Sequence, residues 1–358
     1  MKHIVSIVGA RPQFIKCAPL SRKIREQLTE FLVHTGQHYD DNMSEVFFKE
    51  LGIPSPDVNL QIGSGPHGEQ TGKMLEAIEA ILLEKRPDMV LVYGDTNSTL
   101  AGALAAVKLH IPVAHVEAGL RSFDRRMPEE VNRVLTDHIA SLLFCPTETA
   151  VTNLQKEGIS KGVYVTGDVM VDAISQALPV AREKSTVLED LGLSEGEYYL
   201  ATVHRPSNTD IRENLSSIIE AFSEFTYPVV FPIHPRTRRY LDLHGIDPAR
   251  YPEVILTDPK PYLDMVRLLD GCRMVLTDSG GLQKEAYILQ KPCVTLRDTS
   301  EWVETIEDGW NVLAGADRER IVSEAGRMDG YSGGHRRCYG DGDASGKIVS
   351  LILDYLSG

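Results

Sequence analysis

The chain has 358 residues, with 42% hydrophobic residues, 25% charged residues and a formal net charge of −14 at pH 7. This composition is typical of a globular protein and excludes a fibrous or disordered chain, while the length indicates two domains of about 170 residues each. An acidic chain is a poor general partner for nucleic acid or an anionic membrane, so the positive charge that binds an anionic ligand has to be local.

Short β-branched runs alternate with longer amphipathic segments in the first half of the chain. Strands are predicted over 4–8, 31–35, 89–93, 113–116 and 142–145, and helices over 12–27, 41–51, 71–85, 96–110 and 128–140. The strands are nearly continuous apolar runs, as parallel strands covered on both faces should be. The alternation therefore predicts a right-handed, doubly wound sheet.

The same alternation returns in the second half of the chain. Strands are predicted over 199–203, 229–233, 254–256, 274–277 and 293–295, and a charged helical stretch over 173–189 separates the two series. We expect an N-terminal Rossmann-like domain over 1–170, a C-terminal Rossmann-like domain over 171–343, and a last helix within 344–358 that could pack back on the N-terminal domain. The predicted class is α/β, with two doubly wound domains facing a central cleft, and ligands of such sheets bind at the carboxyl ends of the strands.

The five cysteines argue for a reducing compartment. Cys17, Cys145, Cys272, Cys293 and Cys338 form no CxxC pair, and we expect reduced thiols without zinc or disulfides. No apolar run approaches the length of a membrane span, and the N-terminus lacks the layout of a signal peptide. The sequence thus predicts a cytoplasmic protein without membrane insertion.

The first predicted strand ends in a glycine turn that leads into a helix. Arg11 and Lys16 follow Gly9 and lie near the helix end that attracts anions, although an ordinary turn with surface charges would read the same. The turn contains no GxGxxG motif, so a nicotinamide-dependent dehydrogenase loses its usual support.

Carboxylates follow the next strands of the first half. Asp95 stands between an apolar strand and an apolar helix, where it could act in a site or serve as the N-cap. Glu117 lies where a strand meets a glycine turn, and Arg121 could be a structural partner for it. Glu129 and Glu130 follow a proline at a predicted helix start, a pattern that by itself favours complementing the helix dipole.

Imidazole, guanidinium and glycine residues mark the strand ends of the second half. His204 with Arg205, and His234 one unit later, end strands in a way that modestly favours an anion site. The segment over 277–286 is a strand end, a Ser-Gly-Gly turn and a helix, whose free N–H groups can cradle a diphosphate. Glu285 in that helix could accept hydrogen bonds from ribose hydroxyls.

Seven segments in order resemble the non-hydrolysing UDP-N-acetylglucosamine 2-epimerases along nearly the whole chain. They are GARPQFIK at 9–16, TGQHYD at 35–40, GDTNSTLAGALAA at 94–106, HVEAGLRS at 115–122, MPEEVNR at 127–133, HR at 204–205 and TDSGGLQKEA at 277–286. The resemblance implies the GT-B architecture of many glycosyltransferases, with a UDP-sugar as substrate, no cofactor, no metal and a homodimer.

The resemblance also assigns roles to particular residues. The expected catalytic residues are Asp95, Glu117, Glu129 and His204. The expected substrate-binding residues are Arg11, Lys16, Arg205, His234, Lys260, Met265, Ser279, Gly280, Gly281 and Glu285. Two departures stand out: Trp302 replaces an arginine of the bacterial TERPE motif, and QHYDDNMS at 37–44 replaces a bacterial segment that contributes to an allosteric site.

The implied reaction inverts C2 of the sugar, whose proton is hardly acidic in the ground state. If UDP leaves C1, the developing oxocarbenium acidifies that proton, a base removes it to give a 2-acetamidoglucal, and proton and UDP return. The sequence does not assign the carboxylates to the two faces. Alternatives are a 2-epimerase of related diacetamido sugars or uronic acids, a GT-B glycosyltransferase, a hydrolysing epimerase and a nucleotide-sugar sensor.

Overall fold

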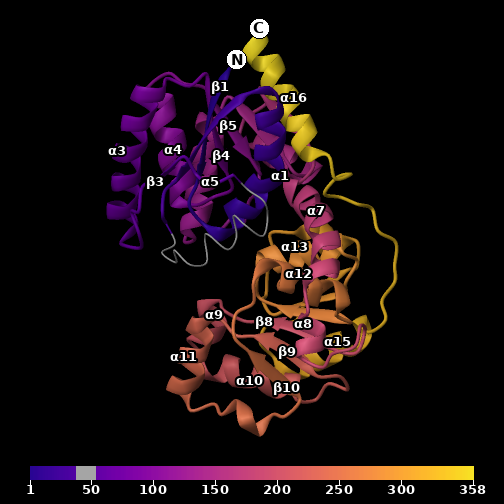
Figure 1. The fold of residues 1–358 in the computed structure, drawn as a ribbon. Helices are drawn as coiled ribbons and strands as arrows, with labels where there is room; N and C mark the ends of the chain where they lie inside the picture. Colours follow the sequence, from indigo (N-terminus) through magenta and orange to yellow (C-terminus); the bar gives the residue numbers. More distant parts are fainter. Residues whose placement is uncertain (38–53) are drawn as a thin grey trace. The chain divides into compact units, whose positions relative to one another are not determined.

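The computed structural model describes residues 1–37 and 54–358, which form two compact units (Figure 1). The first unit comprises Met1–Gln176 together with Cys338–Gly358, and the second unit comprises Ala177–Arg337. The helix predicted over 41–51 and most of the departing segment over 37–44 lie outside the described residues.

The first unit is built on a parallel seven-stranded sheet in the order β3-β2-β1-β4-β5-β6-β7. Its strands are β1 (His3–Val8), β2 (Thr29–His34), β3 (Val58–Asn59), β4 (Met89–Tyr93), β5 (Val113–Val116), β6 (Leu142–Cys145) and β7 (Val163–Val165). Every residue of β4, β5 and β6 is buried, which explains their continuous apolar sequence. The sequence missed β3 and β7, since both edge strands are very short and partly exposed.

Helices cover both faces of this sheet. They are α1 (Arg11–Gln27), α3 (His67–Lys85), α4 (Asn97–Lys108), α5 (Pro128–Ile139), α6 (Glu148–Lys156), the first turns of α7 (Val169–Lys184) and α16 (Ala344–Ser357). Figure 1 shows α1 with α16 on one face and α3 with α4 on the other, and α4 also packs against α5. This two-sided cover is the predicted doubly wound arrangement.

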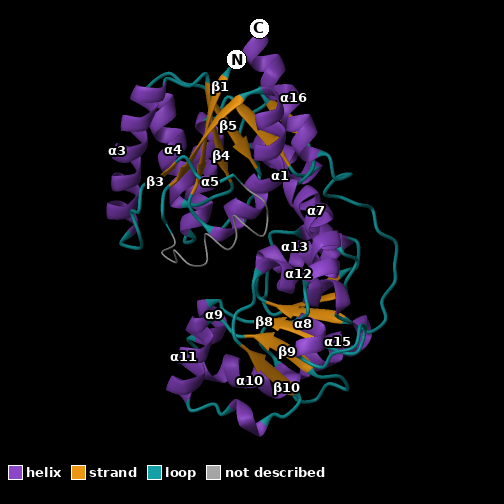
Figure 2. Cartoon of the chain, in the orientation of Figure 1, coloured by secondary structure: helices purple, strands orange, loops and turns teal. Residues whose placement is uncertain are grey.

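The second unit contains a parallel six-stranded sheet in the order β10-β9-β8-β11-β12-β13 (Figure 2). Its strands are β8 (Tyr199–Thr202), β9 (Val229–Pro232), β10 (Val254–Thr257), β11 (Met274–Thr277), β12 (Cys293–Thr295) and β13 (Asn311–Leu313). Its helices include α8 (Val187–Asp190), α9 (Pro206–Thr209), α10 (Arg212–Phe222), α11 (Pro235–His244), α12 (Tyr262–Gly271), α13 (Gly280–Ile288), α14 (Val303–Glu307) and α15 (Arg318–Met328). Separate apolar clusters around Phe231 and around Leu200 form its core.

Strand order reverses at one point in each sheet. In the first sheet the reversal falls between β1 and β4, and in the second between β8 and β11. Such switch points are where open α/β sheets bind ligands, at the carboxyl ends of the strands. The Gly9 and Asp95 turns follow β1 and β4, while His204 and Ser279 follow β8 and β11, so the predicted motifs occupy both switch points.

The last helix belongs to the first unit. Asp168 N–H donates to Tyr339 O at 2.8 Å, and the Asp172 carboxylate accepts hydrogen bonds from Ala344 N–H at 3.1 Å and Ser345 N–H at 2.7 Å. Asp172 thus satisfies free N–H groups at the start of α16. The charged stretch predicted over 173–189 is two helices, α7 and α8, because the helix ends before Ser185.

Four of the five cysteines are buried in the interior of the protein. None of the five cysteines, all of them among the described residues, forms a disulfide, and burial raises the pKa of Cys145, Cys272 and Cys293 to about 12. Within residues 1–37 and 54–358, no helix is both long and apolar enough to cross a membrane.

Candidate active site

One buried amide joins the turns that follow β1 and β4. Gly9 N–H and Ala10 N–H donate to Gln13 Oε1 at 2.8 and 3.0 Å, while Gln13 Nε2 donates to Tyr93 O at 2.7 Å and Thr99 Oγ1 at 3.0 Å. Gln13 therefore holds the first turn of α1 against the start of α4. Arg11, a predicted substrate contact, is the first residue of α1.

Lys16 and Glu117 form an ion pair beside the β4 turn. Their side chains are 10% and 8% exposed, and the Lys16 Nζ donates to Glu117 Oε2. A Cβ placed on Gly94 would lie 3.3 Å from Glu117 Oε2 and 3.7 Å from Lys16 Nζ, so the pair lies directly against this turn. The structure thus joins two residues that the sequence assigned to different roles, a nucleotide contact and a catalytic carboxylate.

Arg121 was considered as the partner of Glu117, and this alternative is wrong. Arg121 instead binds the buried Asp137 at 2.7 Å and Glu157 at 2.7 Å. Asp137 also lies 2.7 Å from His115 Nδ1, and His115 Nε2 donates to Gly94 O at 2.7 Å. This network holds the turn after β4 in place through the contact of His115 with Gly94. The sequence analysis missed Asp137 because it lies inside α5.

The backbone at Glu117 is strained. Its φ is 72°, in the left-handed region that a residue with a side chain rarely adopts. The N–H groups of Glu117 and Ala118 both donate to Phe144 O at 3.1 Å and hold the segment in this conformation. Backbone strain of this kind costs about 1–3 kcal/mol and concentrates at functional sites, so it supports a site at Glu117.

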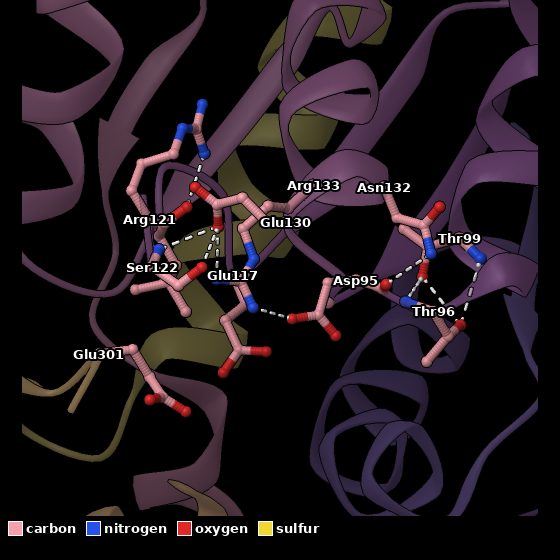
Figure 3. A network of polar contacts seen from close by, with 12 residues as sticks. Asp95, Thr96, Thr99, Glu117, Arg121, Ser122, Glu130, Asn132, Arg133 and Glu301 are labelled. Carbon is pink, nitrogen blue, oxygen red and sulfur yellow. Dashed lines mark hydrogen bonds and ion pairs between the residues drawn. The ribbon is translucent and has the colours of Figure 1, made fainter. Parts of the chain in front are cut away.

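Asp95 forms an ion pair with Arg133 of α5 (Figure 3). Asn132 Nδ2 also donates to the Asp95 carbonyl oxygen at 3.0 Å, so consecutive residues of α5 bind the side chain and the backbone of Asp95. The alternative that Asp95 is an N-cap is wrong, because the N-cap of α4 is Thr96, whose hydroxyl accepts from Thr99 N–H. The Asp95 side chain is 31% exposed and can reach a ligand.

The adjacent glutamates in the first turn of α5 have different surroundings. Glu129, the predicted catalytic residue, is exposed. Glu130 is buried and accepts hydrogen bonds from Ser122 N–H at 2.9 Å and Phe123 N–H at 3.0 Å, and it binds Arg133 at 3.0 Å. Glu130 therefore anchors the preceding loop, a role that the sequence pattern of paired acids at a helix start did not reveal.

Two histidines lie together at the carboxyl edge of the second sheet. The rings of His204 and His234 have centroids 5.8 Å apart. His234 is the N-cap of α11, where its Nδ1 accepts from Arg236 N–H at 3.1 Å. Partial desolvation, the His204 ring and Arg236 hold the pKa of His234 below its ordinary value, so this ring is neutral near pH 7. Arg205 is half-buried at the start of α9.

The Ser-Gly-Gly turn begins α13 as predicted. Ser279 is its N-cap, Gly280 is buried and Gly281 is exposed. A Cβ on Gly280 would overlap the Glu301 carboxylate, so a larger residue here would displace this side chain. Glu285 is half-buried one turn further along the helix.

The remaining predicted residues of the second unit lie on or near α12 and α13. Lys260 is half-buried in the loop between β10 and α12, and Met265 packs against the apolar cluster around Leu200. Trp302, the departure from the bacterial motif, is 5% exposed, and the buried Lys284 lies 4.3 Å from the centre of its ring. Trp302 is thus a packing partner of a buried cation.

Acidic and histidine side chains do not gather into a metal site in the described parts of the chain. No group of three His, Cys, Asp or Glu residues there could hold a metal ion. The chemistry of the described groups is that of carboxylate and imidazole acids and bases, of cations beside them, and of a helix start suited to phosphate.

Two doubly wound parallel sheets, each with its polar groups at the switch point, define a two-domain α/β protein of the GT-B-like class. The predicted fold class is confirmed. Residues 22–353 match the family described as UDP-N-acetylglucosamine 2-epimerase, and the chain belongs to this family.

Similar proteins cover the chain along its whole length. A UDP-N-acetylglucosamine 2-epimerase homolog of Methanococcus maripaludis is 54% identical over 352 residues, which cover 98% of this chain and 99% of the relative. The UDP-2,3-diacetamido-2,3-dideoxy-D-glucuronate 2-epimerase of Pseudomonas aeruginosa is 50% identical, with the same coverage of both chains. The crystal structure of the Methanocaldococcus jannaschii UDP-GlcNAc 2-epimerase in complex with UDP-GlcNAc and UDP has a TM-score of 0.91 at 44% identity and covers 99% of this chain and 100% of that chain. The chain is therefore a UDP-sugar 2-epimerase, an isomerase, as the seven sequence segments predicted.

Proposed function

We propose that this enzyme is a non-hydrolysing UDP-N-acetylglucosamine 2-epimerase that reversibly interconverts UDP-GlcNAc and UDP-ManNAc. The observation that carries the proposal is the pair of carboxylates after the neighbouring strands β4 and β5, Asp95 and Glu117, each beside a cation. A carboxylate can accept a proton from carbon or balance positive charge on a sugar ring.

The chemistry proceeds by elimination and re-addition. The C1–O bond breaks with its electron pair going to UDP, a base takes the C2 proton, and a 2-acetamidoglucal with a C1=C2 double bond forms. A proton then returns to the other face of C2 and UDP re-adds to C1. Asp95, Glu117 and Glu129 are the candidates for the acid–base roles, each typically worth about 10²–10⁴ in rate.

The second unit is proposed to hold the uridine diphosphate. The Ser279-Gly280-Gly281 turn starts α13, where free N–H groups favour an anionic phosphate. Glu285 would accept hydrogen bonds from the ribose hydroxyls. The same edge of this sheet carries His204, Arg205 and His234. Arg11 and Lys16 of the first unit stay predicted substrate contacts.

A second candidate is epimerisation of a UDP-diacetamido-uronic acid. The 50% identity to the Pseudomonas aeruginosa enzyme favours it, and so does Trp302, which departs from the bacterial motif. A uronic acid brings a further carboxylate and requires an additional cation.

The test is proton NMR of the purified full-length enzyme with UDP-GlcNAc in D₂O and without added cofactor. We expect UDP-ManNAc with deuterium at C2, since the proton is lost to a base that exchanges with solvent. Asp95→Asn should lose most of this turnover, whereas Asp354→Asn, the same change at an exposed position of α16, should keep it.

A panel of UDP-sugars separates the candidates. Turnover of the diacetamido-uronic acid with none of UDP-GlcNAc would overturn the first proposal in favour of the second. Release of free sugar and UDP would point to a hydrolysing enzyme, and binding without turnover to a sensor. The homodimer and the cytoplasmic location remain predictions, and sedimentation of the purified protein would test the homodimer.

A further inference from the structure

A fully buried carboxylate lies at the switch point of the second sheet, next to Ser279. Asp278 directly follows β11, is 0% exposed, and donates its N–H to Thr202 O at 3.2 Å, which extends the pairing of β8 with β11. A carboxylate withdrawn from water is costly unless hydrogen bonds and charge compensate it. The hydrogen-bond and ion-pair partners of Asp278 therefore indicate the role of this buried carboxylate.

Most of these partners come from the segment that follows β8. Asp278 Oδ2 accepts from Arg205 N–H at 2.9 Å and from Asn208 Nδ2 at 3.0 Å, and His204 N–H lies 3.0–3.1 Å from both oxygens. Asn208 Nδ2 also donates to Leu296 O at 2.9 Å, so the amide is held in one orientation. These contacts fix the plane of the carboxylate.

The other oxygen faces an imidazole. Asp278 Oδ1 lies 3.1 Å from His204 Nδ1. Burial alone would raise the pKa of Asp278, but the hydrogen bond and charge of His204 and the backbone N–H groups of His204 and Arg205 hold it below its ordinary value. An ionised carboxylate can only accept hydrogen bonds, so this approach of Oδ1 to Nδ1 favours a proton on Nδ1, which leaves the lone pair of the neutral ring on Nε2. The His204 side chain is 38% exposed.

The neighbouring His234 has the opposite arrangement. Its Nδ1 accepts from Arg236 N–H, so in the neutral ring the proton is on Nε2. The carboxylate of Asp278 contacts His204 and not His234 among the described hydrogen bonds and ion pairs. The geometry therefore favours different tautomers for the two rings, 5.8 Å apart, and of the two only His204 lies within ion-pair distance of Asp278.

We propose that Asp278 is a positioning residue for His204. It holds the ring as the Nδ1–H tautomer, so that Nε2 accepts a proton or hydrogen bond from the UDP-sugar, and it stabilises the imidazolium that forms when Nε2 is protonated. This inference rests on the proposed function, because it assumes that His204 contacts the substrate. A merely structural alternative is that Asp278 only braces the segment over 204–208.

The first test reads the tautomer directly and needs no activity. In the full chain labelled with ¹⁵N-histidine, the His204 ring is assigned by the signals lost in His204→Gln. At a pH where the ring is neutral, we expect a protonated Nδ1 and an unprotonated Nε2. Asp278→Asn should move the proton towards Nε2, since an amide N–H facing Nδ1 donates to it. A wild-type ring protonated at Nε2 would overturn the proposal, whatever the enzyme turns over.

The second test is a double-mutant cycle on turnover and on stability. Asp278→Asn should lower kcat by about 10²–10⁴ with little change in KM, and it should cause no further loss when His204 is already glutamine. Its effect on the melting temperature should be the same in both backgrounds. Equal losses of kcat in both backgrounds would assign Asp278 a structural role and overturn the proposal.

Asn208→Ser provides the matched control. It removes a donor from the other oxygen of the same carboxylate and leaves His204 untouched. We expect a lower melting temperature with an unchanged His204 tautomer, because Oδ1 keeps its contact with Nδ1. If Asp278→Asn does not fold, the wild-type tautomer still decides between the two roles.

Discussion

Neighbouring residues of identical type have different physical roles in the first turn of α5. Glu130 is 2% exposed and binds two backbone N–H groups of the preceding loop, whereas Glu129 is exposed to solvent. The sequence assigned both to the helix dipole from pattern alone, and the family resemblance separated them by assigning catalysis to Glu129. The structure explains why Glu130 cannot take the role predicted for Glu129, because the Glu130 carboxylate is buried and bound to backbone N–H groups.

Substituting the two glutamates in turn separates chemistry from stability. Glu129→Gln should lower kcat by about 10²–10⁴ and leave the free energy of unfolding within about 0.5 kcal/mol of the wild type. Glu130→Gln should lower the free energy of unfolding by about 1–3 kcal/mol, because buried N–H groups lose a charged acceptor. Turnover assays and denaturant titrations measure both. Near-normal turnover of Glu129→Gln would remove Glu129 from the catalytic residues.

Single residues also decide the stability of the turn after β4, which the buried network around Asp137 supports. Burial would raise the pKa of Asp137, but His115 and Arg121 bind it and hold the pKa below its ordinary value of 3.8. Because folding lowers this pKa, the stabilisation is present at neutral pH and is lost as the pH falls through the folded-state value.

Replacing this carboxylate should therefore have a pH-dependent cost. Asp137→Asn should lower the free energy of unfolding by about 3 kcal/mol at pH 7, since the buried Arg121 loses one of its two charged partners. The difference from the wild type should shrink below about pH 4, where the Asp137 carboxylate of the unfolded chain begins to protonate. Urea titrations from pH 7 to the acid limit of the fold measure it, and a difference that stays constant with pH would contradict this account.

At the scale of elements, the turn between β1 and α1 depends on an absent side chain. Thr35 Oγ1 and Ser98 Oγ are 2.8 Å apart, and a Cβ on Gly9 would overlap both oxygens. The end of β2 and the start of α4 therefore meet directly over the glycine. The sequence predicted a glycine turn here, but only the tertiary contact explains why no other residue fits.

Two glycine-to-alanine substitutions test this contact. Gly9→Ala should lower the free energy of unfolding by about 1–3 kcal/mol, because the hydroxyls have to move apart. Gly72→Ala is the matched control: it lies exposed within α3 with nothing within 4 Å of the new Cβ, and it should raise stability by about 0.5–1 kcal/mol. Equal effects of the two changes would show that the Gly9 contact does not constrain the turn.

At the scale of the whole molecule, the chain returns to its first unit after completing the second. Ile348, Val349 and Ile352 of α16 are buried, and α16 packs on α1 of the first unit. Residues more than 300 positions apart in the sequence therefore form one core. The two units do not correspond to the two halves of the sequence, because the first unit contains both ends of the chain.

Truncating the buried face of α16 should destabilise the first unit. Ile348→Ala should cost about 2–5 kcal/mol, as expected for a large-to-small change in a packed core. Tyr355→Ala, on the same helix but 45% exposed, should change stability by less than about 0.5 kcal/mol. Calorimetry of the full chain measures both variants. A small effect of Ile348→Ala would mean that α16 contributes little to the stability of the first unit.

The sequence by itself determined the fold class and the family, because local sequence features specify both. Continuous apolar strands alternating with amphipathic helices specify a doubly wound parallel fold, and strand-end motifs such as those at Gly9, Asp95 and Ser279 mark the switch points. Edge strands such as β3 and β7 were missed, since a few partly exposed residues leave no apolar run to detect.

The tertiary structure alone decided which charged groups meet. Lys16 pairs with Glu117, Arg133 with Asp95, and Asp278 with His204, across separations of 101, 38 and 74 residues. No local pattern encodes such partners, because they depend on which strand ends are adjacent in the sheet and on how far each side chain reaches across that edge.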